Sequence, residues 1–321
     1  MSPTSIQGNL LHLRDPRVDA IVMNSAGSID TVAHVLGIDP HYLSIQVRLH
    51  IPYYDEAEHG DGIPIIREIL QKLRANLDSF GSTYETHREL NEIDLLPRGC
   101  DLTVSESGAL YMSPPDNSPG VPVRFGSVPE RYGLSIQERL HYIHKARKDT
   151  DFHFGMFLGD ATAPVSYVAF STAIRQYLVN ALVRSIPGYS GNSNEVIVMT
   201  RAFGYSPLPK NTMSKMFDCA AAALRDEGFS YIVTAMNPFL GFRGSIFSGS
   251  SFQCFATSPM RYWYGPTGAY LNRRSAESAQ PQKYDTPPII WAVKGLNRYA
   301  RRRLSASTIV YNIAHDEYDA G

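Results

Sequence analysis

The segment from residue 195 to residue 237 constrains the fold more than any other part of the chain. It opens with EVIVMTRAFG, the most strand-like run in the sequence, and passes through the proline-containing loop YSPLPKN. TMSKMFDCAAAALRDEG then repeats its apolar residues at helical spacing and closes on a glycine, as helices often do. FSYIVTAMN is typical of a second strand. This succession of strand, loop, helix and strand predicts an α+β core.

A tight loop follows the second strand. Asn237 and Pro238 end the strand abruptly, and GFRGSIF continues with glycines at 241 and 244 before a segment that is typical of a helix. A strand, a loop and a helix N-terminus in this order present backbone N–H groups to a ligand. Asn237 is therefore a candidate functional residue, and a simple Asn-Pro turn is the alternative.

Composition places the chain among ordinary globular proteins. Of its 321 residues, 43% are hydrophobic and 19% are charged, which suits one or two domains. No run approaches the ~18 consecutive apolar residues of a membrane span, and the N-terminus lacks the pattern of a secretory signal. We therefore expect a cytoplasmic protein with no membrane partner. Cys219 and Cys254 are expected in the core, and no metal site is expected because the histidines lack ligand spacing.

Charge is distributed unevenly along the chain. Residues 1–130 contain 18 acidic and 9 basic side chains, a net charge of −9, whereas residues 131–321 contain 21 basic and 13 acidic ones, a net charge of +8. Such opposition predicts either that the two parts dock on each other or that the basic part meets phosphate groups. The stretch from Ser113 to Gly133 is rich in proline and glycine, as linkers are. We therefore divide the chain into an acidic α/β part, residues 1–130, and a second domain, residues 131–321, with a basic tail.

Further elements are predicted around the central segment. CDLTVSESGALYMSP predicts a β-hairpin, LSIQERLHYIHKARK an amphipathic helix, and FHFGMFLG and PVSYVAFSTA two strands. AIRQYLVNALVRS predicts a short helix, and FQCFATSPMRYWYG with AYLNRR predicts another hairpin.

The element order from about residue 135 onward resembles the GNAT (Gcn5-related acyltransferase) fold. Arg201 ends the central strand, Asn211 and Ser214 open the next helix in KNTMS, and NPFLGFRGSIFSGSSF follows the second strand. These motifs are similar to those of the divergent GNAT branch that includes the phage Mom DNA-modification proteins. The resemblance covers residues 135–275. It implies a mixed central sheet flanked by helices and a group-transfer reaction.

The sequence departs from both patterns at particular positions. GNAT enzymes carry Q/R-x-x-G-x-G/A where the long helix begins, because glycine lets backbone amides approach the CoA pyrophosphate. LPKNTM, residues 208–213, stands there without either glycine, so no cofactor is certain and acyl-CoA is one candidate donor among others. Against the Mom-like pattern, Asn237 replaces an acid, Phe242 or Arg243 a histidine, and Phe247 a tyrosine.

Five residues are candidates for binding the donor: Arg201, Asn211, Ser214, Arg243 and Gly244. Arg201 can clamp a carboxylate or phosphate with two parallel hydrogen bonds, and a structural ion pair is the alternative. Asn211 and Ser214 lie where a helix mouth binds phosphate or carbonyl groups, although a plain helix cap explains them too. Arg243 is either an anion contact or a solvated loop charge.

Three residues are candidates for catalysis: Tyr167, Asn237 and Ser250. Tyr167 lies on a predicted strand that faces the expected cleft, where its phenol would donate a proton or position the substrate. Ser250 belongs to SGSS, whose hydroxyls are hydrogen-bond donors for a ligand or surface groups without a role. His153 is expected to be a strand histidine with its hydrogen bonds satisfied.

The basic tail KGLNRYARRR, residues 294–303, is the best nucleic-acid signal in the chain, because it combines five cations with Tyr299. Arg298, Arg301 and Arg302 are the candidate contacts. A solvated charged helix, or one docked on the acidic part, is the alternative.

These observations favour a transferase that moves an acyl or aminoacyl group to an amine or hydroxyl of a small molecule or nucleic acid. An aminoacyl-tRNA donor would suit the net charge of +8. Two alternatives stay open: a Mom-like enzyme that modifies a nucleobase in DNA, and a non-catalytic GNAT-like binding protein.

Overall fold

The computed structural model describes residues 44–45, 48–49, 99–116, 118–139, 141, 146–204, 208–242, 244–264, 270–271 and 282–314. The chain forms two compact units. One comprises Met1–Glu92, Phe239–Gly241 and Met260–Thr286, and the other comprises Ile93–Pro238, Phe242–Pro259 and Pro287–Gly321. Most of the acidic part predicted from the sequence lies outside the described residues, and the division at residue 130 stays a prediction.

A mixed sheet organises the described residues. Its strands follow the order β1-β2-β3-β4-β5-β6-β7-β10-β8-β11, with β9 paired to β8. Neighbours from β1 to β6 are antiparallel, β6 and β7 are parallel, and β7 and β10 are antiparallel. The strands are β1 (Asp101–Val104), β2 (Leu110–Ser113), β3 (Val121–Ser127), β4 (Phe152–Leu158), β5 (Ser166–Ser171), β6 (Val196–Gly204), β7 (Tyr231–Met236), β8 (Gln253–Tyr264), β9 (Tyr270–Leu271), β10 (Gln282–Gly295) and β11 (Tyr311–Asn312).

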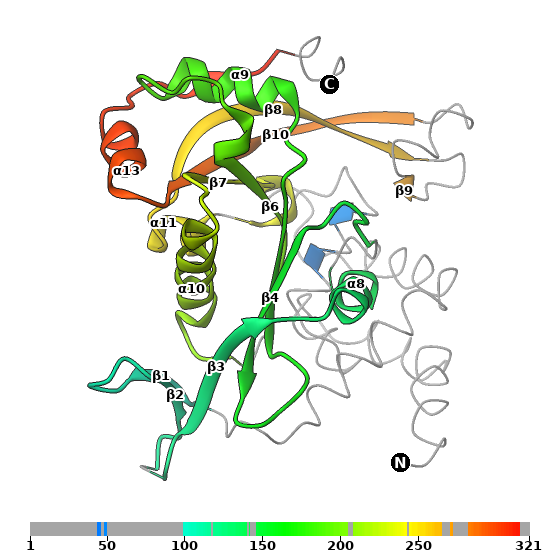
Figure 1. Cartoon of the computed structure of the whole chain (residues 1–321). Helices are drawn as coiled ribbons and strands as arrows, with labels where there is room; N and C mark the ends of the chain where they lie inside the picture. Colours follow the sequence, from blue (N-terminus) through cyan, green and yellow to red (C-terminus); the bar gives the residue numbers. More distant parts are fainter. Residues whose placement is uncertain are drawn as a thin grey trace, which may run out of the picture. The chain divides into compact units, whose positions relative to one another are not determined.

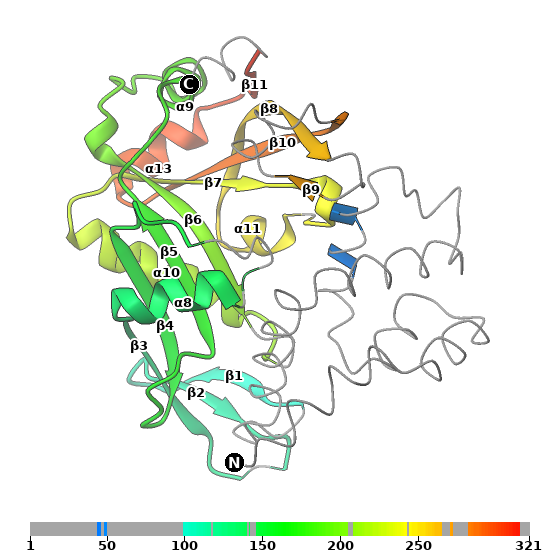
Figure 2. The same ribbon diagram turned by 90° about the vertical axis from the view of Figure 1, so that its right-hand side faces the viewer.

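Side chains alternate between the two faces of the sheet, and a helix covers each face of β4–β6. On one face Phe154, Phe170 and Met199 pack with Met216 and Phe217 of α10 (Thr212–Asp226) in the main apolar core. The opposite face meets α8 (Glu130–Arg139). Figures 1 and 2 both show α10 and α8 on opposite sides of these strands.

A second apolar cluster joins α9 (Gln176–Ser185) and α13 (Arg298–Ser305) to β7, β8 and β10. Trp291 lies in it and donates its indole N–H to the hydroxyl of Ser258 at 2.9 Å. Three short helical segments complete the described part: η1 (Ser193–Glu195), η2 (Pro238–Leu240) and α11 (Ser245–Gly249). This second cluster fixes the C-terminal helix α13 against the sheet.

The α+β class predicted from the sequence, with a mixed sheet flanked by helices, is confirmed. The predicted linker is wrong in part, because Val121–Ser127 forms β3 and pairs with β2 and β4. VPVRFGS alternates its side chains as a strand does, but the surrounding prolines hide that pattern. Cys219 is half-buried, whereas the core prediction for Cys254 is wrong because its side chain is exposed on β8.

The smaller unit has few described contacts. The phenol of Tyr264 donates to the carbonyl of Leu49 at 2.7 Å, and Arg261 pairs with Asp285 at 2.7 Å. None of the described helices is both long enough and apolar enough to cross a membrane.

Two glycines that face each other on β3 and β4, Gly126 and Gly155, differ in the space around them. A Cβ added to Gly155 would lie 2.6 Å from Pro164 Cβ and 2.8 Å from Val128 Cγ2, whereas one on Gly126 would come no closer than 3.6 Å to a neighbour. Overpacking should therefore lower the free energy of unfolding of Gly155→Ala by about 1–3 kcal/mol. Gly126→Ala is the matched control and should lose none. Urea denaturation measures both, and equal losses would contradict this packing.

Candidate active site

The parallel strands β6 and β7 separate halfway along their length. They pair only from Val196–Tyr231 to Met199–Thr234. Beyond this point β6 stays paired with β5, and β7 with β10. Among the described residues, the backbone edge of β6 that faces β7 therefore has no strand partner from Thr200 to Gly204, and the two strands separate there.

A β-bulge accounts for the opening. The β5–β6 register shifts where Ala169 faces Arg201 and Phe170 faces Met199, which leaves Thr200 as the extra residue. A bulge bends its strand and increases the local twist, and this one directly follows the last β6–β7 pair. It also turns Arg201 to the opposite face from Met199, so that Arg201 shares the α8 face with Ala169.

The N-terminus of α10 follows the open end of β6. Asn211, the residue before the helix, adopts the left-handed conformation with φ of 67°, and its side chain makes no capping hydrogen bond. The carbonyls of Pro209 and Asn211 accept the backbone N–H groups of Thr212 and Lys215. Within the described chain, the backbone N–H groups of Met213 and Ser214 have no acceptor. Two aligned donors at a helix N-terminus attract an anion.

The charges around this terminus fit an anion as well. The first turn of α10 contains no acidic residue, and Lys210 and Lys215 flank it. Cations at a helix N-terminus oppose the helix dipole and destabilise the helix. An anionic ligand would offset that penalty. The two lysines in LPKNTMSK indicate an anion site, and they were not among the residues predicted from the sequence.

Asn211 bears on the absence of the two motif glycines from LPKNTM, the segment that enters α10. Glycine is the usual left-handed residue, and asparagine is the other residue type that adopts this conformation readily. The chain thus keeps a glycine-like backbone at the entry to α10 although the sequence has neither glycine of the GNAT pattern.

Tyr167 lies at the centre of a buried hydrogen-bond network beneath α8. Its side chain is 1% exposed, and its hydroxyl accepts from Gln137 Nε2 at 2.9 Å and lies 2.6 Å from His153 Nδ1. Burial raises the pKa of Tyr167 to about 12, against smaller opposing effects of Gln137 and Arg201. The phenol therefore keeps its proton at neutral pH. It can donate a hydrogen bond but cannot act as a base, and its catalytic role stays a prediction.

The same network fixes the tautomer of His153. If the Gln137 amide donates to the phenol, the phenol donates to Nδ1 and the proton of the ring sits on Nε2. That Nε2 is buried, with no hydrogen-bond partner in the described part of the chain. Burial lowers the pKa of His153, so the ring is neutral. The sequence-based expectation of a fully satisfied histidine is therefore only half right.

Arg201 is half-buried on the α8 face of β6 and donates from Nη1 to the carbonyl of Thr200 at 2.7 Å. Its charge acts on both Tyr167 and Asp149, whose pKa values it lowers as a secondary effect. The side chain of Arg147 is the main cause of the lowered pKa of Asp149. Arg201 thus lies beside the Tyr167 network at the opening, although whether it clamps a donor stays a prediction.

The loop after β7 holds three further candidates. Asn237 is 9% exposed, and its carbonyl accepts the backbone N–H of Phe242 at 3.3 Å. Gly244 has φ of 78°, a backbone conformation that favours glycine, and a Cβ there would lie 2.7 Å from Met236 Sδ. Ser250 is 2% exposed and donates its hydroxyl to the carbonyl of Ile246 at 2.9 Å. Arg243 lies outside the described residues.

An apolar cavity of about 620 Å³ lies beside this loop. Met236 of β7, Phe247 of α11 and Phe252 are among its lining residues, with Ile290 of β10. Ser245 and Ser248 also line it.

The tail candidates lie elsewhere, on α13. Arg298, Arg301 and Arg302 are all exposed, and Arg301 also donates to the backbone carbonyls of Gly295 and Leu296 at 3.2 and 3.0 Å. Their contact with nucleic acid stays a prediction. No group of three histidine, cysteine or acidic side chains that suits a metal was found among the described residues.

Comparison with known proteins gives similarity at the level of solved structures only. No family model and no curated protein sequence matches the chain. A GNAT-family N-acetyltransferase (YhbS) from Escherichia coli in complex with CoA is 14% identical over 62% of this chain and 92% of its own, with a TM-score of 0.32. An acetyltransferase (yncA) from Salmonella typhimurium with acetyl-CoA is 8% identical over 55% and 95%, with a TM-score of 0.35.

A ribosomal-protein-S5-alanine acetyltransferase from Vibrio fischeri is 10% identical over 56% of this chain and 94% of its own, with a TM-score of 0.33. At these values nothing about substrate or donor is transferred from the three proteins to this chain.

The backbone conformation of Asn211 can be tested by substitution. Asn211→Gly should leave the free energy of unfolding within a few tenths of a kcal/mol of the wild type, because glycine adopts positive φ freely. Asn211→Val should lower it by about 1–2 kcal/mol, since a β-branched side chain is strained there. Thermal and urea denaturation check both. A valine variant as stable as the glycine variant would show that the entry to α10 is not left-handed.

The neutral state of His153 predicts a dependence on pH. Because the pKa is lowered on folding, the unfolded chain binds a proton more readily below the unfolded pKa of about 6.5, and the free energy of unfolding falls as pH drops. His153→Gln removes this titration and keeps a hydrogen-bonding amide beside Tyr167. As the pH is lowered from about 7.5 to 5, the free energy of unfolding of the variant should therefore rise relative to that of the wild type, as measured by urea denaturation. A difference that does not change with pH would contradict a lowered pKa.

Proposed function

We propose that this chain transfers an acyl group from a phosphate-bearing donor to an amine or hydroxyl. The opened pair of parallel strands that leads into the N-terminus of α10 carries the proposal. At one end of the sheet it places two lysines, a stretch of β6 backbone and two N–H groups of α10, and neither the stretch nor the N–H groups have a backbone partner among the described residues. Such a place suits an extended donor with a phosphate at one end and the reactive carbonyl at the other.

Each part of the opening has a task in this reaction. The N–H groups of Met213 and Ser214 would hold the phosphate, and the edge of β6 beyond Met199 would pair with an extended, amide-containing chain. A backbone N–H on that edge can also stabilise the oxyanion that forms when the acceptor attacks the carbonyl. Asn237, at the end of β7, would orient the acceptor or donor from the other side.

The α8 face supplies the polar surroundings of the acceptor. Arg201 lies there beside the network of Tyr167 and His153. Because Tyr167 keeps its proton and His153 is neutral, the network adds no net charge beside Arg201. An amine acceptor would then lose its proton to solvent water as its nitrogen bonds to the acyl carbon. The bond from that carbon to the donor breaks when the tetrahedral intermediate collapses, and the leaving group takes up a proton from water. The site's contribution is orientation and electrostatic stabilisation.

The proposal also names a particular donor. Acyl-CoA has the phosphate and the extended amide chain that the geometry suits, so it is the donor we propose to test first. An aminoacyl-tRNA donor, action on a nucleobase of DNA and a non-catalytic binding role stay predictions, and no contact among the described residues favours them.

Ser214→Glu should have opposite effects on the stability of α10 and on binding of the donor. An acid in the first turn should stabilise α10 by about 0.3–1 kcal/mol, yet it should repel an anionic donor. We expect the wild type to bind CoA and acetyl-CoA in isothermal titration and the variant to bind them at least about tenfold more weakly, a loss of about 1.4 kcal/mol.

Ser193→Glu is the matched control. It adds the same charge at an exposed position before the other end of β6, and it should bind as the wild type does. A wild type that binds neither ligand, or a Ser214→Glu variant that binds equally well, would overturn CoA as the donor held at α10.

A further inference from the structure

A second cavity, of about 440 Å³, has a polar lining and lies beside the C-terminal half of α10. Lys294 and Gly295 of β10 line it, and they pair with Ile232 and Tyr231 at the start of β7. The strand opening begins only after Thr234. The cavity is therefore separate from the proposed acyl-transfer site, and all of its lining residues belong to one compact unit.

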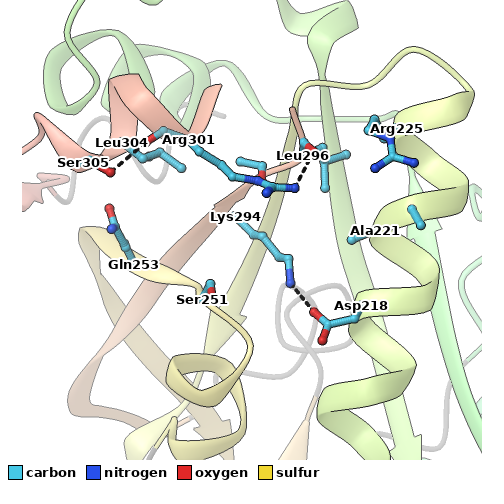
Figure 3. A pocket seen from close by; sticks show the side chains of 12 residues that line it. Asp218, Ala221, Arg225, Ser251, Gln253, Lys294, Leu296, Arg301, Leu304 and Ser305 are labelled. Atoms are coloured by element: carbon cyan, nitrogen blue, oxygen red, sulfur yellow. Dashed lines mark hydrogen bonds and ion pairs between the residues drawn. The ribbon is translucent and has the colours of Figure 1, made fainter. Parts of the chain in front are cut away.

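Three cations from three different elements approach this cavity. Figure 3 shows Arg225 of α10, Lys294 of β10 and Arg301 of α13 around the same space, with Asp218 below Lys294. The lining carries three positive charges and one negative charge. Ser251, Gln253 and Ser305 add neutral polar groups, and Leu296 and Leu304 add apolar surface.

Lys294 is held in place and still has a proton to donate. Its side chain is 8% exposed, and Nζ donates to Asp218 Oδ1 at 2.6 Å and to the carbonyl of Ser250 at 2.7 Å. An ammonium group has three N–H donors. The third has no hydrogen-bond acceptor among the described residues, although the Phe252 ring centroid lies 5.7 Å from Nζ, and a buried donor without an acceptor is costly.

Arg301 is positioned by the backbone. Nε donates to the carbonyl of Gly295 and Nη2 to that of Leu296, at 3.2 and 3.0 Å, and Nη1 has no acceptor among the described residues. A Cβ on Gly295 would lie 2.8 Å from the backbone N of Arg301, so the glycine lets α13 approach β10 this closely. Asn297 caps α13 by accepting the N–H of Ala300 at 2.8 Å. The guanidinium is thereby fixed before any ligand arrives.

We infer that this cavity binds a phosphomonoester of up to about the size of a mononucleotide. A phosphate dianion matches the net charge of +2 on the lining, and its oxygens would accept from Lys294 Nζ and from the guanidinium groups of Arg301 and Arg225. A cavity of 440 Å³ is within the range of small-molecule sites, and its leucines suit a ring or sugar behind the phosphate. Among the described residues, Arg225 otherwise pairs with its exposed neighbour Asp226, at 3.0 Å.

The test uses isothermal titration of the full chain with inorganic phosphate and with adenosine monophosphate at constant ionic strength, with chloride as the control anion. Both probes should bind saturably to the wild type and to Ser214→Glu, which alters only the donor site. Arg225→Gln should weaken binding about tenfold, equivalent to about 1.4 kcal/mol. Tighter binding of the nucleotide would identify an organic phosphate, and equal binding a free phosphate.

Arg302→Gln is the matched control, because Arg302 is an exposed arginine of α13 outside the cavity lining. It should bind both probes as the wild type does. Lys294→Gln should also weaken binding of both probes, and circular dichroism checks that this variant folds. If Lys294→Gln does not fold, Arg225→Gln alone provides the test. Absence of saturable binding, or an equal loss in Arg302→Gln, would overturn the cavity as a phosphate site.

Discussion

The extra residue at Thr200 is the constraint on which the rest of the site depends. It lies where β6 stops pairing with β7, and it changes the face on which the following side chains point. In a regular strand with no bulge, Arg201 would share its face with Met199 and point into the apolar core against α10, where an unpaired charge is very costly. With it, Arg201 joins the polar face beside Tyr167, and the backbone of β6 becomes available to a ligand.

The two faces of the central strands differ in chemistry, since one is apolar and the other holds a polar network. The face against α10 is built from phenylalanine and methionine side chains and supplies stability by burial. The face against α8 buries Gln137, His153 and Tyr167 in a network that is nearly satisfied. Polar networks of this kind fix one arrangement of their members, because any other would leave more donors without acceptors.

The sequence predicted the strand, helix and strand of the centre because each has a strong period of its own. It did not predict β3, since prolines around VPVRFGS mask the alternation, and it did not predict the bulge at Thr200, since register depends on the partner strand. Asn211 was recognised as a residue of the helix mouth, but its left-handed backbone depends on tertiary context. Ser250 was proposed from a serine-rich motif, and only the structure shows its hydroxyl bonded to the helix carbonyl of Ile246.

The order of strands in the sheet has a consequence for how the chain is made. β10 lies between β7 and β8 although it comes after both in the sequence. During synthesis the edge of β7 therefore has no neighbour on that side until Gly295 has left the ribosome, and β8 cannot reach its final position before then. The nascent chain exposes an apolar strand edge for this interval, the kind of edge that pairs with other chains. The sheet, the Lys294 contacts and the docking site for α13 can therefore be completed only after β10 has been made.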